Sequence, residues 1–203
     1  MKVALIGITG NVGTRLSAEL LRRRHEVTGI ARNPDKVSSQ PGLTTKRGDV
    51  KNETELAQLL AGHDAVIHSV MFQSSDPHKV LRATKKAGVK RLLVVGGAGS
   101  LAVAPGKQLV DTPEFPDIYK AEAMAGRDFL NVLRTEKDLD WTFLSPSAFL
   151  APGERTGKFR LGGDELLIGA DGESKISMED FAIALVDELE NPGHSRQRFT
   201  VGY

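Results

Sequence analysis

The 203-residue chain contains no cysteine, and this absence excludes several kinds of chemistry at once. Without thiols the chain forms no disulfide, offers no thiolate ligand to a metal ion and has no cysteine nucleophile. The five histidines also lack the mutual spacing of a metal site. We therefore expect neither a disulfide framework nor a metal centre.

The sequence likewise lacks an excess of charge of either sign, because 27 Lys and Arg stand against 26 Asp and Glu. With a net charge of +1, no global field attracts nucleic acid or a membrane surface. No apolar run approaches the roughly 20 residues of a membrane span, and the first residues lead directly into an apolar strand pattern. We expect a cytoplasmic enzyme or binding protein that acts on a small molecule, as a monomer or a weak dimer.

The most informative segment runs from Gly7 to Gly13 with the spacing G-x-x-G-x-x-G. It follows the apolar residues 3–6 and precedes a helical pattern. A strand, a glycine turn and a helix N-terminus form a phosphate cradle, because first-turn N–H groups lack internal partners and the helix dipole favours an anion. Glycine spacing alone also fits an ordinary turn, but this context is the one that a dinucleotide motif requires. We expect cofactor contacts from Gly7, Thr9, Gly10, Asn11, Val12 and Gly13.

Apolar segments alternate with amphipathic ones along most of the chain, which predicts a doubly wound parallel sheet. The expected strands are residues 3–6, 26–31, 43–46, 64–70, 91–95 and 141–144. Helix starts are indicated by Asn52 with Glu55, Asp76-Pro77, Asp117, and Ser177 with Asp180. The helix from Asp117 is expected to turn Ile118 and Phe129 inward.

The C-terminal quarter has a different pattern. Residues 157–161 and 165–168 flank Gly162-Gly163-Asp164, which predicts a hairpin, and residues 198–201 predict an edge strand. At this length we expect a single domain over residues 1–203. The expected fold class is α/β, a Rossmann-like doubly wound parallel sheet with a small C-terminal hairpin and helix on the substrate side.

The end of the second strand bears on the choice of cofactor. A carboxylate there binds a free ribose 2′-hydroxyl, whereas a basic residue accommodates a 2′-phosphate. The sequence provides Arg32, with Asn33 beside it. Because a guanidinium suits bidentate phosphate contact, we expect NADP(H) to be preferred, with NAD(H) possible. The alternative is that Arg32 caps a turn at the surface.

Polar residues also follow the third and fourth strands. Asp49 and Val50 close the third strand, where Asp49 either accepts from an adenine amino group or serves as a turn or helix-flanking residue. His68, Ser69 and Val70 end the fourth strand, on the crest along which a cofactor lies in an open α/β sheet. A histidine there is either a cofactor contact or a packed residue.

Several of these segments together resemble a known family. The glycine turn, Arg32, residues 48–50, the loop after Gly96-Gly97, residues 145–147 and residues 176–182 are similar to those of atypical short-chain dehydrogenases/reductases of the NAD(P)H-binding, NmrA-like type. The most similar members are small bacterial proteins described as NADH-flavin reductases, which resemble biliverdin/flavin reductase. The resemblance covers nearly the whole chain.

Within this family, standard members use a Tyr-x-x-x-Lys pair and a serine after the fifth strand for proton transfer. Here Lys120 fits the lysine position and is expected to hold the nicotinamide ribose, but Pro116 stands four residues earlier. Tyr119 is adjacent to Lys120 and so points about 100° away on a helix. The serine position holds Gly97 or Ala98, with Ser100 slightly further on. The candidate catalytic residues are therefore Lys120, Ser100 and Tyr119, without a standard relay.

The resemblance implies further contacts near the nicotinamide. Pro146 and Ser147, after the sixth strand, correspond to the family's nicotinamide contact, and Gly97 is expected beside the cofactor. Phe149, Tyr119 and residues 99–115 are expected to shape an acceptor pocket, or to serve as simple packing. Arg155 and Arg160 are either anion-binding or surface residues.

A missing proton relay favours an acceptor that needs no placed acid. A flavin or quinone takes its proton from solvent, so placing the two rings face to face is the main requirement. We expect an NADPH-dependent flavin or quinone reductase. The alternatives are a non-catalytic NADP(H)-sensing protein of the NmrA-like type, or an enzyme like the nucleotide-sugar epimerases and dehydratases, for which the chain is short.

Overall fold

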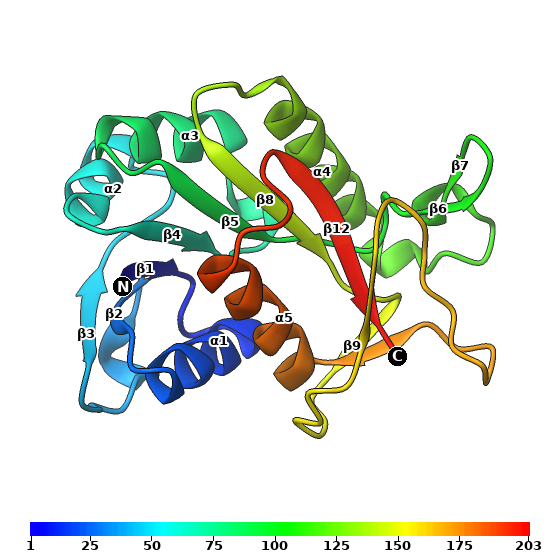
Figure 1. Ribbon diagram of the computed structural model, residues 1–203. Helices are drawn as coiled ribbons and strands as arrows, with labels where there is room; N and C mark the ends of the chain where they lie inside the picture. The colour runs from blue at the N-terminus through cyan, green and yellow to red at the C-terminus, as the bar shows by residue number, and fades with distance from the viewer.

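An eight-stranded sheet runs through the centre of the computed structural model, which describes residues 1–203 (Figure 1). In sheet order the strands are β10 (Arg160–Gly162), β12 (Gln197–Gly202), β8 (Asp140–Ser145), β5 (Arg91–Val95), β4 (Ala65–His68), β1 (Lys2–Ile6), β2 (Glu26–Ala31) and β3 (Leu43–Arg47). All neighbours are parallel except β10 and β12, which are antiparallel. The predicted doubly wound parallel sheet is confirmed.

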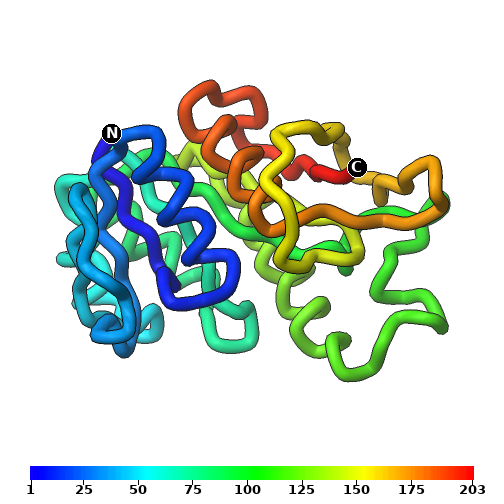
Figure 2. The backbone as a smooth tube through the Cα atoms, turned by 90° about the horizontal axis from the view of Figure 1, so that it is seen from below, coloured from blue at the N-terminus to red at the C-terminus, as the bar shows by residue number.

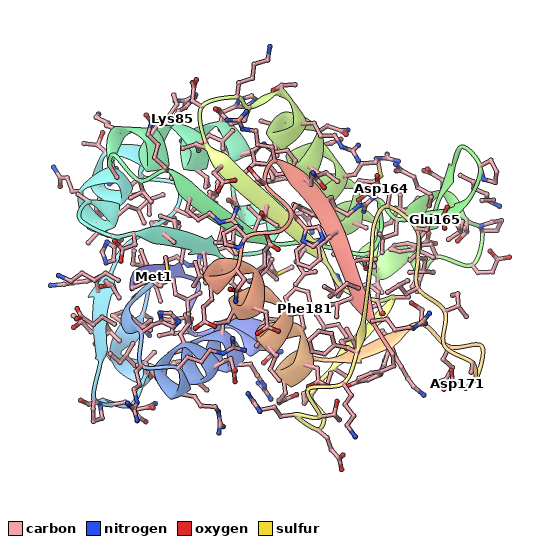
Figure 3. The ribbon with its side chains drawn as sticks, in the orientation of Figure 1. Met1, Lys85, Asp164, Glu165, Asp171 and Phe181 are labelled. Carbon is pink, nitrogen blue, oxygen red and sulfur yellow. The ribbon has the colours of Figure 1, made fainter.

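Helices cover both faces of this sheet (Figures 1 and 2). One face is covered by α1 (Asn11–Arg22) and α5 (Met178–Glu190), and the other by α2 (Glu53–Leu60), α3 (Pro77–Lys86) and α4 (Asp117–Thr135). Each face has its own core of about twenty buried apolar residues. Phe181 on α5, for example, is fully buried near the middle of the molecule (Figure 3). No helix combines the length and apolar character that crossing a membrane would need.

Three helices begin at the residues that the sequence predicts. The side chains of Asn52, Asp76 and Ser177 accept hydrogen bonds from first-turn N–H groups of α2, α3 and α5. The helix α4 begins at Asp117 without a side-chain cap. The expectation that Ile118 turns inward is wrong, because that side chain is 83% exposed at the first turn, outside the packed part of the helix.

Short elements shape the loops at the C-terminal ends of the strands. The segment after β5 contains β6 (Ala102–Ala104), β7 (Lys107–Gln108) and the 3₁₀ turn η3 (Leu109–Asp111). Two further 3₁₀ turns, η1 (Pro34–Lys36) and η2 (Phe72–Ser74), follow β2 and β4. The strand β9 (Phe149–Ala151) pairs with β11 (Lys175–Ser177) outside the main sheet.

The predicted C-terminal hairpin is wrong. The strand β10 pairs with β12 rather than with residues 165–168, and Glu165 instead forms a bridge with Ala102 of β6. Figure 3 shows Asp164 and Glu165 beside that part of the chain. The strand β12 is also not the predicted edge strand, because it lies between β8 and β10. Its residues Phe199 and Val201 are buried in the core that α1 and α5 cover.

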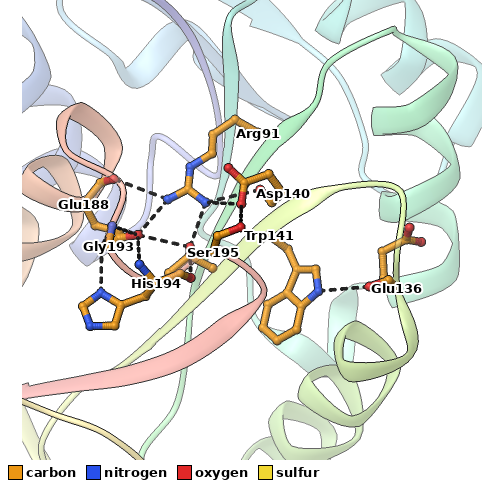
Figure 4. Close-up of polar contacts among 9 residues, drawn as sticks. Arg91, Glu136, Asp140, Trp141, Glu188, Gly193, His194 and Ser195 are labelled. Atoms are coloured by element: carbon orange, nitrogen blue, oxygen red, sulfur yellow. Dashed lines mark hydrogen bonds and ion pairs between the residues drawn. The ribbon is translucent and has the colours of Figure 1, made fainter.

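A buried ionic cluster ties α5 to the start of β5 and β8 (Figure 4). The guanidinium of Arg91 donates to Glu188 Oε1 at 3.0 Å and to Thr142 Oγ1 at 2.8 Å. His194 Nδ1 lies 2.8 Å from Glu188 Oε2, and its ring stacks on Phe199 at 4.0 Å. The cluster lies at the N-terminal ends of the strands, opposite the loops described next.

Candidate functional site

The C-terminal ends of the parallel strands hold the first cavity, of about 220 Å³. The strands β1 and β4 are neighbours whose following helices, α1 and α3, cover opposite faces of the sheet. Open α/β sheets bind ligands at such a switch point. The cavity is lined by Ile6, Gly7, Thr9, Gly10, Ile30, Ala31, Arg32, Gly48, Asp49, Val50, Lys51, Ser69, Val70, Met71 and Ser74.

The glycines of the turn after β1 have two different roles. Gly7 has φ +89°, and a Cβ there would lie 2.0 Å from the Ser69 carbonyl oxygen. A Cβ on Gly13 would lie 2.1 Å from the Gly7 carbonyl oxygen, so these two glycines are required by the fold itself. Gly10 is exposed, and the nearest atom to a Cβ there is 3.4 Å away. Space therefore remains open over Gly10 for a ligand to approach the backbone.

The N-terminus of α1 is left free for an anion. Gly10 stands at the N-cap, where it supplies no capping side chain, and the first turn holds no acidic residue. The N–H groups of Asn11, Val12 and Gly13 have no acceptor within the helix. Asn11, Val12 and Gly13 are not among the residues that line the cavity, so their contacts with a cofactor stay predictions. A free helix terminus and an open glycine backbone fit the diphosphate of a dinucleotide.

The predicted residues after β2 and β3 are partly brought together. Arg32 lines the cavity, is exposed and makes no ion pair. Asp49 and Val50 line it too, and Asp49 Oδ1 also accepts from the Lys51 N–H at 2.9 Å, as a turn residue does. Asn33 is exposed beside Arg32 but lies outside the cavity lining.

His68 does not reach the site, although the sequence places it on the crest with Ser69 and Val70. Its ring is fully buried, with Nε2 2.8 Å from Ser75 Oγ and the ring centroid 5.1 Å from that of Phe129. Burial lowers the pKa of His68 to about 4, so the ring is neutral at pH 7. The last residue of β4 points into the core, and only Ser69 and Val70 line the cavity.

A second cavity, of about 580 Å³, lies at the ends of β5 and β8. Four segments contribute most of its lining: residues 96–100, called the floor below, the first half of α4, residues 146–150, and residues within 109–116. The lining consists of Phe72, Gly96, Gly97, Ala98, Gly99, Ser100, Leu109, Thr112, Glu114, Phe115, Pro116, Tyr119, Glu122, Ala123, Gly126, Arg127, Pro146, Ser147, Ala148, Phe149 and Leu150. The predicted residues Gly97, Ser100, Tyr119, Pro146 and Ser147 are therefore brought together here.

The segment 69–74 borders both cavities. Ser69, Val70, Met71 and Ser74 line the first, and Phe72 lines the second. Glu122 of α4 holds this segment by accepting from the N–H groups of Phe72, at 2.5 Å, and Gln73, at 3.0 Å. Sequence reasoning missed Glu122, although its i, i+3 spacing from Tyr119 places both on one helix face.

Of the predicted residues on α4, Tyr119 lines the second cavity and Lys120 does not. Tyr119, Glu122 and Ala123 line the cavity, whereas Lys120 is exposed and lies outside the lining. The role of Lys120 as a ribose contact stays a prediction. Four residues after Tyr119 stands Ala123, so the helix carries no Tyr-Lys pair toward the cavity.

Ser100 lies on the cavity floor in front of a buried arginine. Arg198 Nη1 lies 3.4 Å from Ser100 Oγ and 3.2 Å from Ser145 Oγ. Because Ser100 Oγ accepts from Arg198, its own proton is free to be donated elsewhere. The hydroxyl proton of Ser147 is already used within the fold, because it is donated to the Val201 carbonyl at 2.9 Å.

Two arginines that the sequence offers as anion-binding or surface residues lie outside both cavities. Arg155 pairs with Glu19 of α1 at 2.8 Å, and Arg160 donates to the backbone carbonyls of Ile168 and Tyr203. Both arginines hold C-terminal segments in place. This agrees with the interpretation that they are surface residues rather than anion-binding ones.

The parallel sheet, the glycine cradle and the free helix N-terminus define a dinucleotide-binding protein of the Rossmann class. A family model described as NAD(P)H-binding matches residues 7–192. The chain belongs to this NAD(P)H-binding family, which confirms the resemblance seen in the sequence.

Three similar proteins cover the chain from end to end. YwnB of Bacillus subtilis is 41% identical, over 99% of this chain and 98% of its own length. The crystal structure of a "putative epimerase" from Bacteroides thetaiotaomicron is 43% identical, covering 100% of this chain and 96% of its own, with a TM-score of 0.95. That of a "putative NADH-flavin reductase" from Streptococcus pneumoniae is 35% identical, covering 100% and 99%, with a TM-score of 0.86.

Proposed function

We propose that the protein is an NADPH-dependent reductase that transfers a hydride directly to a flavin or quinone. The observation that supports this most is the second cavity: it is open, largely apolar, adjacent to the dinucleotide cradle, and bordered by a helix face without a Tyr-Lys pair. The description of the Streptococcus pneumoniae relative as a flavin reductase agrees with it.

Different residues of the cradle bind different parts of the cofactor. The backbone of residues 7–13 binds the diphosphate, and the free guanidinium of Arg32 binds the ribose 2′-phosphate, so that NADPH is preferred to NADH. Asp49 meets the adenine side. Pro146 and Gly97, in the second cavity, meet the nicotinamide side.

When bound, NADPH supplies a hydride, and the acceptor takes its proton from solvent. The chain then needs to hold the acceptor ring flat against the nicotinamide and to keep other molecules from the space between the two rings. Tyr119 and Phe149 border the mouth, both more than 60% exposed, and provide aromatic surface for such a ring. The free proton of Ser100 hydrogen-bonds to a carbonyl oxygen of the acceptor, where negative charge grows during reduction.

The absence of a lysine partner for Tyr119 argues against chemistry that needs a strong placed acid or base. Reduction of a ketone, or epimerisation of a sugar, requires a proton at a defined atom as the hydride moves. In this cavity the position four residues after Tyr119 holds Ala123, and no histidine lines it. The epimerase description of the Bacteroides relative is thus less well supported for this chain.

The test is a panel of acceptors incubated with the protein and NADPH. We expect loss of NADPH absorbance with riboflavin or menadione, and no comparable loss with simple ketones or aldehydes. NADPH binding is measured in parallel by calorimetry. Tight binding without turnover of any flavin or quinone would overturn the reductase and favour a redox-sensing protein.

A further inference from the structure

Charge is distributed unevenly around the second cavity. The floor, residues 96–100, and the wall formed by residues 146–150 carry no ionisable side chain. All ionisable groups of the lining apart from the Tyr119 phenol come from the other two sides, and they are Glu114, Glu122 and Arg127. The lining therefore holds two carboxylates and one guanidinium.

The single guanidinium is already neutralised. Arg127 Nη1 donates to the two Asp111 oxygens at 3.1 and 3.3 Å and to Gln108 Oε1 at 3.4 Å. This pair holds η3 against α4. Glu114, by contrast, is exposed and has no hydrogen-bond or ion-pair partner, so its charge faces the opening uncompensated.

The other cations near the cavity lie outside its lining. Arg198 lies behind the floor, its side chain is 3% exposed, and it pairs with Asp164 at 2.6 Å. Lys120 is exposed and lies outside the cavity lining. No unpaired cation therefore lines the cavity to receive a phosphate or carboxylate of an acceptor.

We infer that the second cavity selects an uncharged planar acceptor, an unphosphorylated isoalloxazine or a neutral quinone, and disfavours the same rings when they carry a phosphate or another anionic group. The inference rests on the proposed reductase function. Like charges at an interface oppose association, and Glu114 and Glu122 oppose an anion here with no free cation to offset them. The balanced reaction is NADPH, one proton and riboflavin giving NADP⁺ and dihydroriboflavin.

The test compares matched acceptors that differ in one anionic group: riboflavin with FMN, and 1,4-naphthoquinone with its 2-sulfonate. We expect kcat/KM to favour the neutral member of each pair by about tenfold at low ionic strength, and this ratio to shrink as salt screens the carboxylates. Fluorescence quenching of riboflavin and FMN, titrated onto protein saturated with NADP⁺, gives the corresponding ratio of dissociation constants without turnover.

A charge-reversal variant assigns the effect to the cavity. Glu114→Lys is expected to narrow the riboflavin-to-FMN ratio several-fold, whereas Glu26→Lys, an equal change at the opposite ends of the strands, is expected to leave it unchanged. Reduction of FMN as efficiently as riboflavin, or an equal shift in both variants, would overturn the inference while leaving the reductase intact. Absence of binding and turnover for all four acceptors would instead remove the proposed function.

Discussion

The carbonyl oxygen of Gly7 lies 2.1 Å from the position that a Cβ on Gly13 would take, but 3.4 Å from that of a Cβ on Gly10. The same added methyl group is therefore expected to act differently at the two sites. Gly13→Ala forces the turn apart and destabilises the fold by about 2 kcal/mol or more. Gly10→Ala leaves the fold nearly unchanged but covers the cradle, weakening NADPH binding about tenfold or more.

Urea denaturation and calorimetry with NADPH separate these two effects. A Gly10→Ala protein that binds NADPH as tightly as the unaltered chain would show that the diphosphate does not approach this backbone.

Arg32 is expected to set the cofactor preference. Because its guanidinium is exposed at the cavity and unpaired, Arg32→Asp removes a charge-assisted contact and adds a repulsive charge. The affinity for NADPH should fall about tenfold or more, with NADH affected little. Dissociation constants for both cofactors provide the measurement, and Lys86→Asp on α3 is the matched control. Equal losses for NADPH and NADH would contradict the assignment.

Tyr119 is expected to act through its ring rather than its hydroxyl. Since no lysine stands four residues later to assist proton transfer, Tyr119→Phe should keep kcat within about threefold for a quinone. Tyr119→Ala removes the aromatic border of the cavity and should raise KM about tenfold. Steady-state kinetics with menadione distinguish the two variants. A loss of kcat in Tyr119→Phe comparable to that of a general-acid mutant would indicate a proton relay instead.

The ionic cluster around Glu188 is expected to matter for stability and not for binding. Glu188→Ala removes the buried one of the two carboxylates that pair with Arg91, which costs about 3 kcal/mol of unfolding free energy. Asp140→Ala, which removes the more exposed partner of Arg91, should cost less than about 1 kcal/mol. Chemical denaturation measures both values. A changed NADPH affinity in the Glu188 variant would link the two ends of the sheet, which we do not expect.

Buried His68 is expected to make stability depend on pH. Its pKa is lowered from 6.5 to about 4 by burial, so between these values the unfolded chain binds a proton that the folded protein does not. The unfolding free energy should therefore decrease as pH falls from 6.5 to 4, by about 3 kcal/mol from this group. His68→Gln cannot titrate and should show a shallower pH dependence over that range. Urea titrations at a series of pH values test this, and parallel profiles would refute it.

Local signals in the sequence were sufficient for most of the fold. Capping residues such as Asn52 and Ser177 specify where a helix begins by chemistry within one turn, and continuous apolar runs such as residues 91–95 specify buried strands. The glycine turn was predictable for the same reason, because strand, turn and helix are contiguous.

What depended on distant partners was not predictable. Residues 160–162 form a strand, but their partner is β12, about forty residues later, and the nearer segment after Gly162-Gly163 pairs elsewhere. The site also depends on a distant contact. The helix α4 packs on Phe72 through Gly126, where an added Cβ would lie 2.9 Å from the ring. This packing sets which side chains of α4, Tyr119 or Lys120, line the cavity. No local sequence motif indicates this contact.

The position of β12 between β8 and β10 has a consequence for how the protein is made. During synthesis, β8 leaves the ribosome more than fifty residues before β12 and stands with one side unpaired until Gln197–Gly202 arrives. Ser100, on the floor of the second cavity, accepts a hydrogen bond from Arg198 of this late strand. A nascent chain can therefore complete its glycine cradle well before it can complete the place where an acceptor would sit.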